Sequence, residues 1–375
     1  MKNILITGGA GFIGCNLALK LLSNGYNVRV LDNLSIQIHG VNPETTSPLY
    51  VSIKDKVDFI HGDITNKLNV EKAVKNQNIV IHLASETGTG QSMYKISRYI
   101  ETNVLGTALL LEECLKANVK RFILSSSRAV YGEGSWYCSC CGPVHPSLRE
   151  RQDDSMPTNW NPCCPLCGIF TTNILPTSEG EIISPTSVYG VSKATQEQLV
   201  ALVGKTSSMS YSILRFFNVF GPGQALDNPY TGVLGVLLNR ARAGKHIDLY
   251  EDGEIMRDFV YVDDVVESIV LAMTSETQDI YNIGGGYAVT IRELAEMLTD
   301  FTTSMSSLSV TGKMRIGDVR GLVADISHAE HSLKWRPSTD FSAGLRKFIE
   351  WALQREFQDR YEESLQELRM RGLYR

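Results

Sequence analysis

Residues 1–14 read MKNILITGGAGFIG, an apolar run that ends in four closely spaced glycines. The run Ile4 to Thr7 has the apolar and β-branched composition of a buried strand. Because glycine has no Cβ, the turn after this strand can bend tightly and approach a bound diphosphate. The next residues, Phe12 to Ser23, have the pattern of a helix whose N-terminal N–H groups would face the same diphosphate. We therefore predict a strand, a turn and a helix that bind a dinucleotide; an ordinary strand–turn–helix is the alternative.

A second apolar run, Val28 to Leu31, ends in Asp32, about 20 residues beyond the glycine turn. A carboxylate at this point can accept hydrogen bonds from an adenosine ribose and would repel a 2′-phosphate. We therefore expect NAD rather than NADP as the cofactor. The predicted contacts from this part of the chain are Gly8, Gly11, Phe12, Ile13, Gly14, Asp32 and Asn33.

Composition excludes several classes of protein. The chain has 375 residues, of which 43% are hydrophobic, so it can bury the core of one large or two modest domains. Its formal net charge of −5 disfavours nucleic acid and anionic membranes as partners. No run approaches about twenty consecutive apolar residues, and the first residues resemble a strand rather than a signal peptide. We expect a cytoplasmic protein with no membrane or nucleic-acid partner.

Strand-like and amphipathic segments alternate along the first part of the chain. This alternation predicts an α/β fold of the Rossmann type, a doubly wound parallel sheet with helices on both faces. We expect residues 1–215 to form this domain and 216–375 a smaller α/β substrate-binding lobe that can return segments to the sheet. The further predicted strands are 57–61, 79–83, 122–125 and 211–216.

Two strand ends add candidate cofactor contacts. Asp63 and Ile64 follow the strand 57–61, where the Asp63 carboxylate could receive an adenine amino group or simply cap the loop. Leu83 and Ala84 close the next strand, where small residues leave room for a flat cofactor. His82, just before them, is expected to be a core histidine.

Two predicted helices carry polar side chains that suit catalysis. Tyr94 to Lys116 contains Asn103, and Ser187 to Val203 contains Tyr189 and Lys193. Residues four apart share a helix face, so the Lys193 ammonium would favour the phenolate of Tyr189. A surface Tyr/Lys pair is the alternative. The strand 122–125 continues into Ser126 and Ser127, whose hydroxyls would face the crevice in which such sheets bind ligands. The polar loop 88–93, with Gln91 and Ser92, is a candidate for substrate contact.

Together these segments resemble the extended short-chain dehydrogenase/reductase family, in its nucleotide-sugar epimerase/dehydratase branch. The resemblance runs nearly end to end. It rests on residues 7–14, 82–84, 103–107, 125–132, 189–193, 214–222, 257–264, 281–286 and 317–320.

The resemblance implies a role for several side chains. Ser127 would orient the sugar hydroxyl, Tyr189 would be the acid/base, and Lys193 would hold the nicotinamide ribose and lower the pKa of Tyr189. Asn103 would contact the cofactor. Three lobe residues would hold the diphosphate of a nucleotide sugar: Asn218, Arg257 and Arg320. The family also forms homodimers through a four-helix bundle, to which the helices 94–116 and 187–203 correspond.

One departure from the family pattern bears on the reaction. Dehydratases of this branch carry an Asp-Glu pair directly after the catalytic hydroxyl, where this chain has Arg128 and Ala129. We therefore expect a 4-epimerase that works through a transient 4-keto sugar. In its loop 90–94 and its cysteine spacing the chain resembles branch members that act on deoxythymidine-diphosphate L-rhamnose, and the resemblance implies this sugar nucleotide as a possible substrate. Uridine-diphosphate hexoses or N-acetylhexosamines, a dehydratase or reductase, and a regulatory binding protein on the same fold are the alternatives.

Six of the eight cysteines lie between residues 138 and 167. Cys138 and Cys141, like Cys164 and Cys167, are separated by two residues and followed by a glycine, which is the spacing of zinc knuckles. We predict one closed, structural zinc site in an insertion spanning 134–184 that roofs the sugar pocket. Disulfides are the alternative, and so is a shifted ligand set that uses Cys140, Cys163 or His145.

Overall fold

A computed structural model describes residues 2–146, 159–226, 228 and 232–374, and a seven-stranded sheet forms its centre. The strand order is β15-β10-β5-β4-β1-β2-β3, and every neighbouring pair is parallel. The order reverses between β1 and β4, which opens a crevice at the carboxyl ends of these strands. The predicted doubly wound fold is confirmed. The strands are β1 (Asn3–Thr7), β2 (Asn27–Asp32), β3 (Asp58–His61), β4 (Ile79–His82), β5 (Arg121–Ser127), β10 (Ser210–Phe216) and β15 (Asp279–Ile283).

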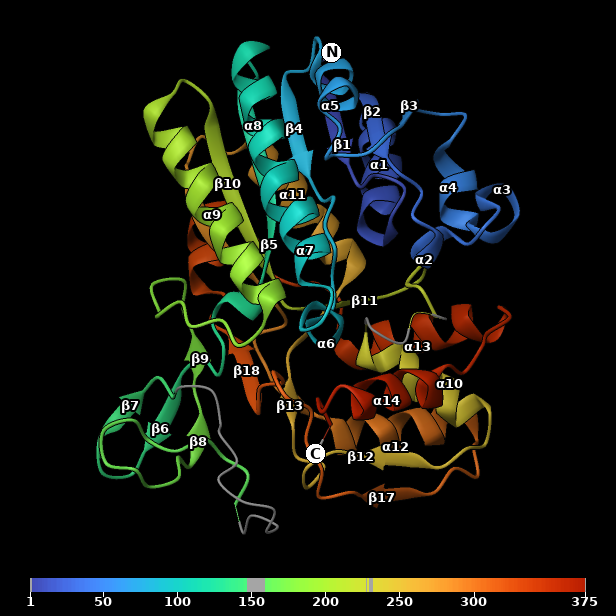
Figure 1. The fold of residues 1–375 in the computed structure, drawn as a ribbon, viewed down its shortest axis with the longest axis vertical. Coiled ribbons are helices and arrows are strands. Elements are labelled where there is room, and N and C mark those ends of the chain that lie inside the picture. Colours follow the sequence, from blue (N-terminus) through green and yellow to red (C-terminus); the bar gives the residue numbers. More distant parts are fainter. Residues whose placement is uncertain (1, 147–158, 227, 229–231, 375) are drawn as a thin grey trace.

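Helices cover both faces of this sheet because successive strand side chains point to opposite sides. Ile4 and Ile6 pack with α1 and α11, whereas Leu5 packs with the core formed by α5, α8 and α9. Figure 1 shows α8 and α9 in front of the strands and α11 behind them. The bounds are α1 (Phe12–Ser23), α5 (Lys67–Val74), α8 (Gly106–Lys116), α9 (Val188–Thr206) and α11 (Val262–Thr274).

One predicted helix is interrupted, and the chain ends in two further helices. The segment 94–116 is divided into α7 (Ile96–Tyr99), a π-helical turn η1 (Ile100–Leu105) and α8. The C-terminal segment forms two helices, α13 (Phe341–Leu353) and α14 (Tyr361–Met370). The second of these, α14, packs its buried side chains against Val236 and Tyr250 of the smaller lobe.

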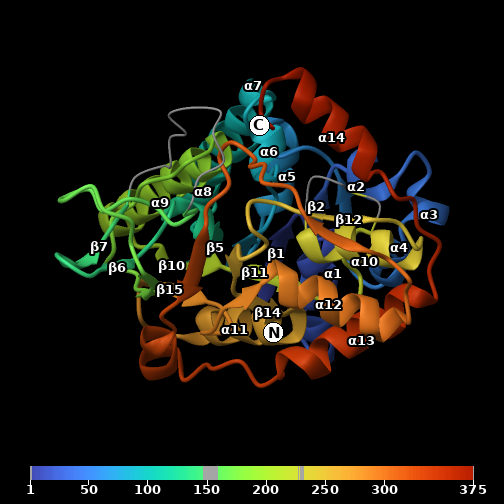
Figure 2. The ribbon, with the colours of Figure 1, turned by 90° about the horizontal axis from the view of Figure 1, so that it is seen from below.

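The smaller lobe has its own apolar core between helices and short strands. Figure 2, seen from below, shows α10, α12 and α13 gathered on the side away from the strands β6 and β7. Although β15 and α11 lie beyond residue 216 in the sequence, they belong to the main sheet and its helical layer. The lobe contains α10 (Val233–Arg242), α12 (Ile291–Thr302), β11 (Asn218–Phe220) paired with β14 (Phe259–Tyr261), and β12 (Ile247–Leu249) paired with β17 (Leu308–Val310).

The cysteine-rich insertion forms a small antiparallel sheet and then joins the lobe. Its three strands are β6 (Trp136–Cys138), β7 (Gly142–Val144) and β8 (Asn173–Ile174). The return arm β9 (Pro176–Thr177) pairs with β18 (Gly321–Ala324), which continues through β13 (Met256–Arg257) to β16 (Val289–Thr290). The insertion is thus attached to the lobe by a strand as well as by the chain.

The remaining described elements are short: α2 (Ile36–His39), α3 (Pro43–Thr46), α4 (Pro48–Ile53), α6 (Thr89–Ser92), η2 (Arg128–Val130) and η3 (Ala329–Leu333). None of the helices in the described part of the chain combines the length and the apolar character needed to cross a membrane.

Candidate active site and metal centre

A cavity of about 580 Å³ lies at the carboxyl ends of the main sheet and extends into the smaller lobe. Its walls include the ends of β2, β5 and β10, the residues that follow β1 and β4, and the lobe helix α10. A cavity at the switch point of a doubly wound sheet is where such folds bind ligands.

The glycine turn forms one end of the cavity, and its geometry leaves no room for side chains. Gly8 has a φ of +69°, and a Cβ there would lie 2.6 Å from the backbone nitrogen of Ala84. A Cβ at Gly14 would collide with the carbonyl oxygen of Gly8 and lie 2.6 Å from the Cα of Gly9. These close backbone approaches let the turn and the start of α1 present N–H groups to a diphosphate, so the site fits a dinucleotide.

The carboxylate of Asp32 is held in place next to this turn. Its Oδ2 accepts a hydrogen bond from the backbone N–H of Ala10 and its Oδ1 accepts one from Leu34, both at 2.9 Å. Most of the predicted cofactor contacts share the cavity wall with it: Gly8, Gly11, Phe12, Ile13, Gly14, Asn33, Ile64, Leu83 and Ala84.

Asp63 and Asn103 are not among the residues that line the cavity. The carboxylate of Asp63 accepts hydrogen bonds from Asn33 and from Thr65, as a loop cap does. The fully buried amide of Asn103 bonds both backbone groups of Glu86, at 2.8 and 3.0 Å, and donates to the Ser192 hydroxyl at 2.9 Å. Both residues therefore shape cavity-lining loops.

Gln91 and Ser92, which the sequence suggests as substrate contacts, are also not among the residues that line the cavity. Both side chains are buried within α6, where the Ser92 hydroxyl donates to the carbonyl oxygen of Thr89 at 2.6 Å. The preceding residues 87–90 line the cavity in their place. Helix formation by this segment turns its later side chains inward, which a prediction of a flexible loop misses.

Ser127, Tyr189 and Lys193 meet at the centre of the cavity, as the sequence predicts. The turn η2 packs tightly against the start of α9, because a Cβ at Gly190 would lie 2.5 Å from the carbonyl oxygen of Ala129. This close packing brings the Ser127 hydroxyl into a side-chain hydrogen bond with Tyr189. The Lys193 ammonium donates to the carbonyl oxygen of Ser125 at 2.9 Å and lies 6.0 Å from the centre of the Tyr189 ring.

Burial is the largest cause of the pKa shifts of Tyr189, Lys193 and His82. Burial raises the pKa of Tyr189, while the hydrogen bond with Ser127 and the charge of Arg128 lower it. Burial also lowers the pKa of Lys193, to about 7. His82 is confirmed as a core histidine, because burial lowers its pKa to about 3 and its ring contacts two threonine hydroxyls.

The lobe supplies arginines to the other end of the cavity, but Arg320 is not one of them. Arg257 and Asn218 line the cavity as predicted. The buried guanidinium of Arg320 instead pairs with Glu251 at 3.0 Å and Asp252 at 2.5 Å. Its Nε donates to Asn161 of the insertion at 3.3 Å, so Arg320 joins the insertion to the lobe.

Several cavity-lining residues were missed by sequence reasoning. Arg315 and Asp318 line the cavity beside Tyr250, with the Arg315 guanidinium 5.4 Å from the centre of the Tyr250 ring. The motif Gly317-Asp318 did mark this part of the chain as a candidate for the site. It has an arginine on either side, Arg315 and Arg320, and the sequence does not indicate which of the two faces the cavity. Helix α14 contributes Tyr361 and Ser364, which no motif marked.

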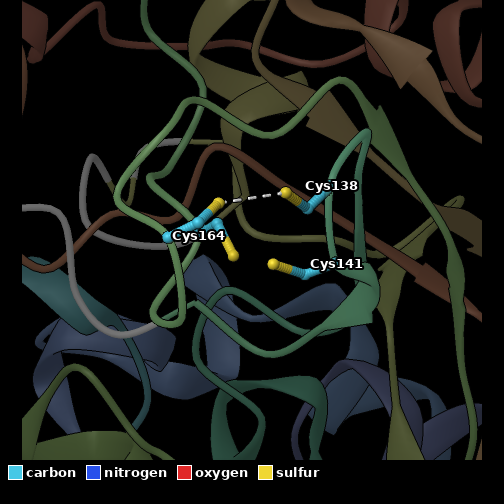
Figure 3. A group of neighbouring side chains, drawn as sticks. Cys138, Cys141 and Cys164 are labelled. Atoms are coloured by element: carbon cyan, nitrogen blue, oxygen red, sulfur yellow. Dashed lines mark hydrogen bonds between the residues drawn. The ribbon is translucent and has the colours of Figure 1, made fainter.

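The four predicted metal ligands come together in the insertion. The Sγ atoms of Cys138, Cys141, Cys164 and Cys167 all lie within 4.8 Å of one another. Figure 3 shows the sulfurs of the three labelled cysteines directed toward a common point, and the dashed line marks the 3.5 Å contact between Cys138 and Cys167. Zn–S bonds of 2.3 Å in a tetrahedron place sulfurs about 3.8 Å apart, so the cluster is close to a metal-binding geometry.

The alternatives for the cysteines find no support in the structure. All eight cysteines are described, and each has a free thiol. Cys140 and Cys163 are exposed outside the cluster, and His145 pairs with Glu181 at 2.5 Å. Gly142 and Gly168 have φ values of +75° and +77°, which fits the tight turn expected after each pair.

The insertion was predicted to roof the sugar pocket, and its residues 147–158 lie outside the described part of the chain. None of the residues 134–146 and 159–184 lines the cavity. These residues pack beside β18 and contact the lobe through β9 and Asn161. The described residues of the insertion are thus held beside the lobe by this strand pairing and by the bond to Arg320.

Comparisons with known proteins agree with this arrangement. The chain is 36% identical over 94% of its length to dTDP-L-rhamnose 4-epimerase of Burkholderia thailandensis, of which the match covers 95%. It is 30% identical over 93% of its length to a putative UDP-glucose 4-epimerase of Methanocaldococcus jannaschii, covering 97% of that protein.

Two solved structures share the fold. UDP-glucose 4-epimerase of Thermotoga maritima, with UDP-glucose, matches with a TM-score of 0.75 at 29% identity. UDP-glucuronic acid 4-epimerase of Bacillus cereus, in complex with UDP-glucuronic acid and NAD, matches with a TM-score of 0.75 at 26% identity. Each match covers 94% of this chain and 99% of the other.

The sequence profile of the NAD dependent epimerase/dehydratase family matches residues 4–150 and 168–284. The gap in this match falls within the insertion and contains Cys163, Cys164 and Cys167. The matched residues include the glycine turn, Ser127, Tyr189 and Lys193, which the structure brings together in one cavity. The resemblance inferred from the motifs is thereby confirmed, and the chain belongs to the NAD dependent epimerase/dehydratase family.

Proposed function

We propose that the protein is an NAD-dependent nucleotide-sugar 4-epimerase. The observation that carries this proposal is the single cavity that contains the glycine turn with Asp32 and the set Ser127, Tyr189 and Lys193. When bound, NAD supplies a hydride acceptor at C4 of the sugar and a hydride donor for the return step. The named 4-epimerases among the relatives and structural neighbours support the same reaction.

The side chains have distinct roles in this reaction. The Tyr189 oxygen takes the proton of the sugar 4-hydroxyl as the 4-keto sugar forms, and returns it after the sugar has turned. Ser127, which lines the same cavity as Tyr189, orients the same hydroxyl by a hydrogen bond of its own. Lys193, whose ammonium lies close to the end of β5, binds the nicotinamide ribose. Because Asp32 presents a carboxylate to the adenosine ribose, NAD is favoured over NADP.

The nucleotide sugar extends from this centre toward the smaller lobe. Arg257 and Asn218 support this placement, and Arg315 takes the diphosphate role that the motifs suggested for Arg320, because guanidinium groups bind diphosphates well. The relative at 36% identity favours deoxythymidine-diphosphate L-rhamnose as the substrate. Uridine-diphosphate sugars are the alternative that other relatives support. Arg128 and Ala129 disfavour a dehydratase, since neither can act as the second acid or base.

We further propose that the four clustered cysteines hold one structural zinc ion. Four thiolates would fill a tetrahedral site and leave no open position for a substrate, so this metal would stabilise the insertion rather than act on the sugar. A homodimer and a cytoplasmic location stay predictions. Exposed apolar side chains on η1, α8 and α9 support the dimer, among them Leu105, Leu115, Val191 and Leu202.

A panel of nucleotide sugars followed by proton NMR tests the function. The panel contains deoxythymidine-diphosphate L-rhamnose and uridine-diphosphate glucose, N-acetylglucosamine and glucuronate. We expect one or more of them to reach equilibrium with its C4 epimer without added NAD. Loss of water from the sugar instead of inversion at C4, or no change in any sugar by an enzyme that contains NAD, would refute the proposal.

A further inference from the structure

A buried histidine lies beside the carboxylate that binds the adenosine ribose in the proposed function. His39 ends the short helix α2 and is only 3% exposed, yet it lines the cavity together with Asp32. Its Nε2 lies 3.8 Å from Oδ1 of Asp32. This distance is longer than a hydrogen bond, so the two atoms are close without being bonded to each other. Buried polar atoms are normally hydrogen-bonded, and the position of Nε2 therefore calls for an explanation.

The chain around His39 fixes the imidazole ring in place. The backbone N–H of His39 donates to the carbonyl oxygen of Ser35 at 2.8 Å, which closes the single turn of α2. Gly40 follows with a φ of +75°, and a Cβ there would lie 2.5 Å from Oγ1 of Thr46. The Thr46 hydroxyl in turn contacts the carbonyl oxygens of His39 and Asn42. The ring is thus held by protein contacts alone, as a preorganised binding group is.

The neighbours of the ring determine where its proton lies. Nδ1 lies 2.8 Å from the Ser47 hydroxyl, and both side chains are buried. Burial lowers the pKa of His39, although the charge of Asp32 acts in the opposite direction, so the ring is neutral at pH 7 and carries one N–H. A bare Nε2 lone pair would repel the carboxylate, whereas an Nε2–H is attracted to it. The proton therefore lies on Nε2, and the Ser47 hydroxyl donates to Nδ1.

His39 and Asp32 together present a donor and an acceptor to the cavity. The Asp32 carboxylate accepts one bond from Ala10 and one from Leu34, and a carboxylate can accept about four. The Nε2–H of His39 has no hydrogen-bond acceptor among the residues that the structure describes. A hydroxyl group both donates and accepts, and one hydroxyl oxygen can lie about 2.8 Å from each of two atoms with this separation. The pair therefore suits a hydroxyl group.

We propose that His39 is a cofactor-binding residue, whose Nε2–H donates to the 2′-hydroxyl of the adenosine ribose while this hydroxyl donates to Asp32. The inference rests on the proposed NAD dependence and adds a second contact to the ribose. Both halves of the hydroxyl are then recognised. A 2′-phosphate has no comparable proton for Asp32, and a 2′-deoxyribose would leave both side chains unpaired.

A binding cycle with two cofactors tests this contact without any sugar. The full-length protein is freed of NAD by dialysis against charcoal, and calorimetry measures its affinity for NAD and for the analogue with 2′-deoxyadenosine. In His39→Leu we expect the affinity for NAD to fall about 10-fold, as for the loss of a buried hydrogen bond. For the deoxy analogue, the wild-type and His39→Leu affinities should agree within about twofold, because the partner hydroxyl is absent. His39→Phe, which keeps a flat ring but has no donor, should give the same pattern and serves if His39→Leu does not fold.

Thr46→Val is the matched structural control. It removes a contact to the backbone of His39 and leaves the imidazole in the chain, so it should weaken both cofactors by the same factor, if at all. An equal loss for both cofactors in the His39 variants would mean that the histidine only supports the loop, and it overturns the inference. Undiminished affinity for NAD in these variants overturns it as well.

Failure of the proposed function gives a different result. Wild-type protein that binds neither cofactor refutes the NAD dependence and, with it, the role of His39. If the binding cycle behaves as expected but no nucleotide sugar is inverted at C4, the proposed 4-epimerase activity is wrong and the role of His39 in cofactor binding stands.

Discussion

Replacing Gly14 with alanine should weaken cofactor binding and leave the stability of the fold nearly unchanged. The new Cβ would lie 2.6 Å from the Cα of Gly9 and would collide with the carbonyl oxygen of Gly8. Both obstacles are backbone atoms, so the glycine turn itself must move by about 1 Å to restore ordinary contact. Such crowding costs about 1–3 kcal/mol, and alanine returns about 1 kcal/mol through its higher helix propensity.

The cost of crowding and the gain in helix propensity nearly cancel in the free energy of unfolding. Neither effect restores the position of the turn, so NAD binding is still weakened. For 375 residues, 1 kcal/mol moves Tm by about 1 °C, so we expect Tm to fall by about 2 °C or less. Because the displaced turn forms the diphosphate site, the affinity for NAD should fall about 100-fold, which equals about 2.7 kcal/mol. NAD released by denaturation and NAD binding measured by calorimetry provide the assay. Gly180→Ala is the control, since a Cβ there has no atom within 4 Å. A Gly14→Ala protein with wild-type NAD content would refute the reasoning.

Three further predictions concern the acid/base, the metal and the dimer. Tyr189→Phe should lower kcat by about 100-fold or more while NAD and substrate still bind, because only the proton-carrying oxygen is lost; a variant with near wild-type kcat would assign the proton to another group. Wild-type protein should contain about one zinc per chain by mass spectrometry, and Cys164→Ser should lose it and unfold at lower temperature, whereas the exposed Cys140→Ser should keep it. Active wild-type protein without zinc would contradict the assignment. Light scattering should give twice the chain mass of 41.6 kDa, and Leu202→Glu, at a position 63% exposed on α9, should shift the protein toward the monomer, while Leu68→Glu on α5 should not. A wild-type monomer at micromolar concentration would contradict the dimer.

Features set by nearby residues in the chain were predictable. The glycine turn, α1 and Asp32 follow from spacing within about 30 residues, because each imposes its own backbone requirement. The cysteine pairs could be predicted for the same reason, since Gly142 and Gly168 directly follow them and supply the turn that each pair needs.

The placements that failed depend on partners far away in the sequence. Arg320 is turned away from the cavity by Glu251 and Asp252, whose positions only the lobe fold determines. Asn103 fits a motif of the family, yet the π-helical turn that holds it directs its amide to the backbone of Glu86. Helix α14 reaches the cavity because its apolar face packs on Tyr250, which its charged sequence does not reveal.

The last strand of the main sheet, β15, has a consequence for biosynthesis. It pairs over its whole length with residues 212–216 of β10, although it is made more than sixty residues later in the chain. Until residue 283 has left the ribosome, β10 is an uncovered edge with free N–H and carbonyl groups, which readily pair with other chains. A fragment that ends at residue 215 would retain this open edge permanently, and we expect it to aggregate even though it contains the glycine turn, Ser127, Tyr189 and Lys193. Cofactor half-domains prepared from this chain should therefore include β15 and α11.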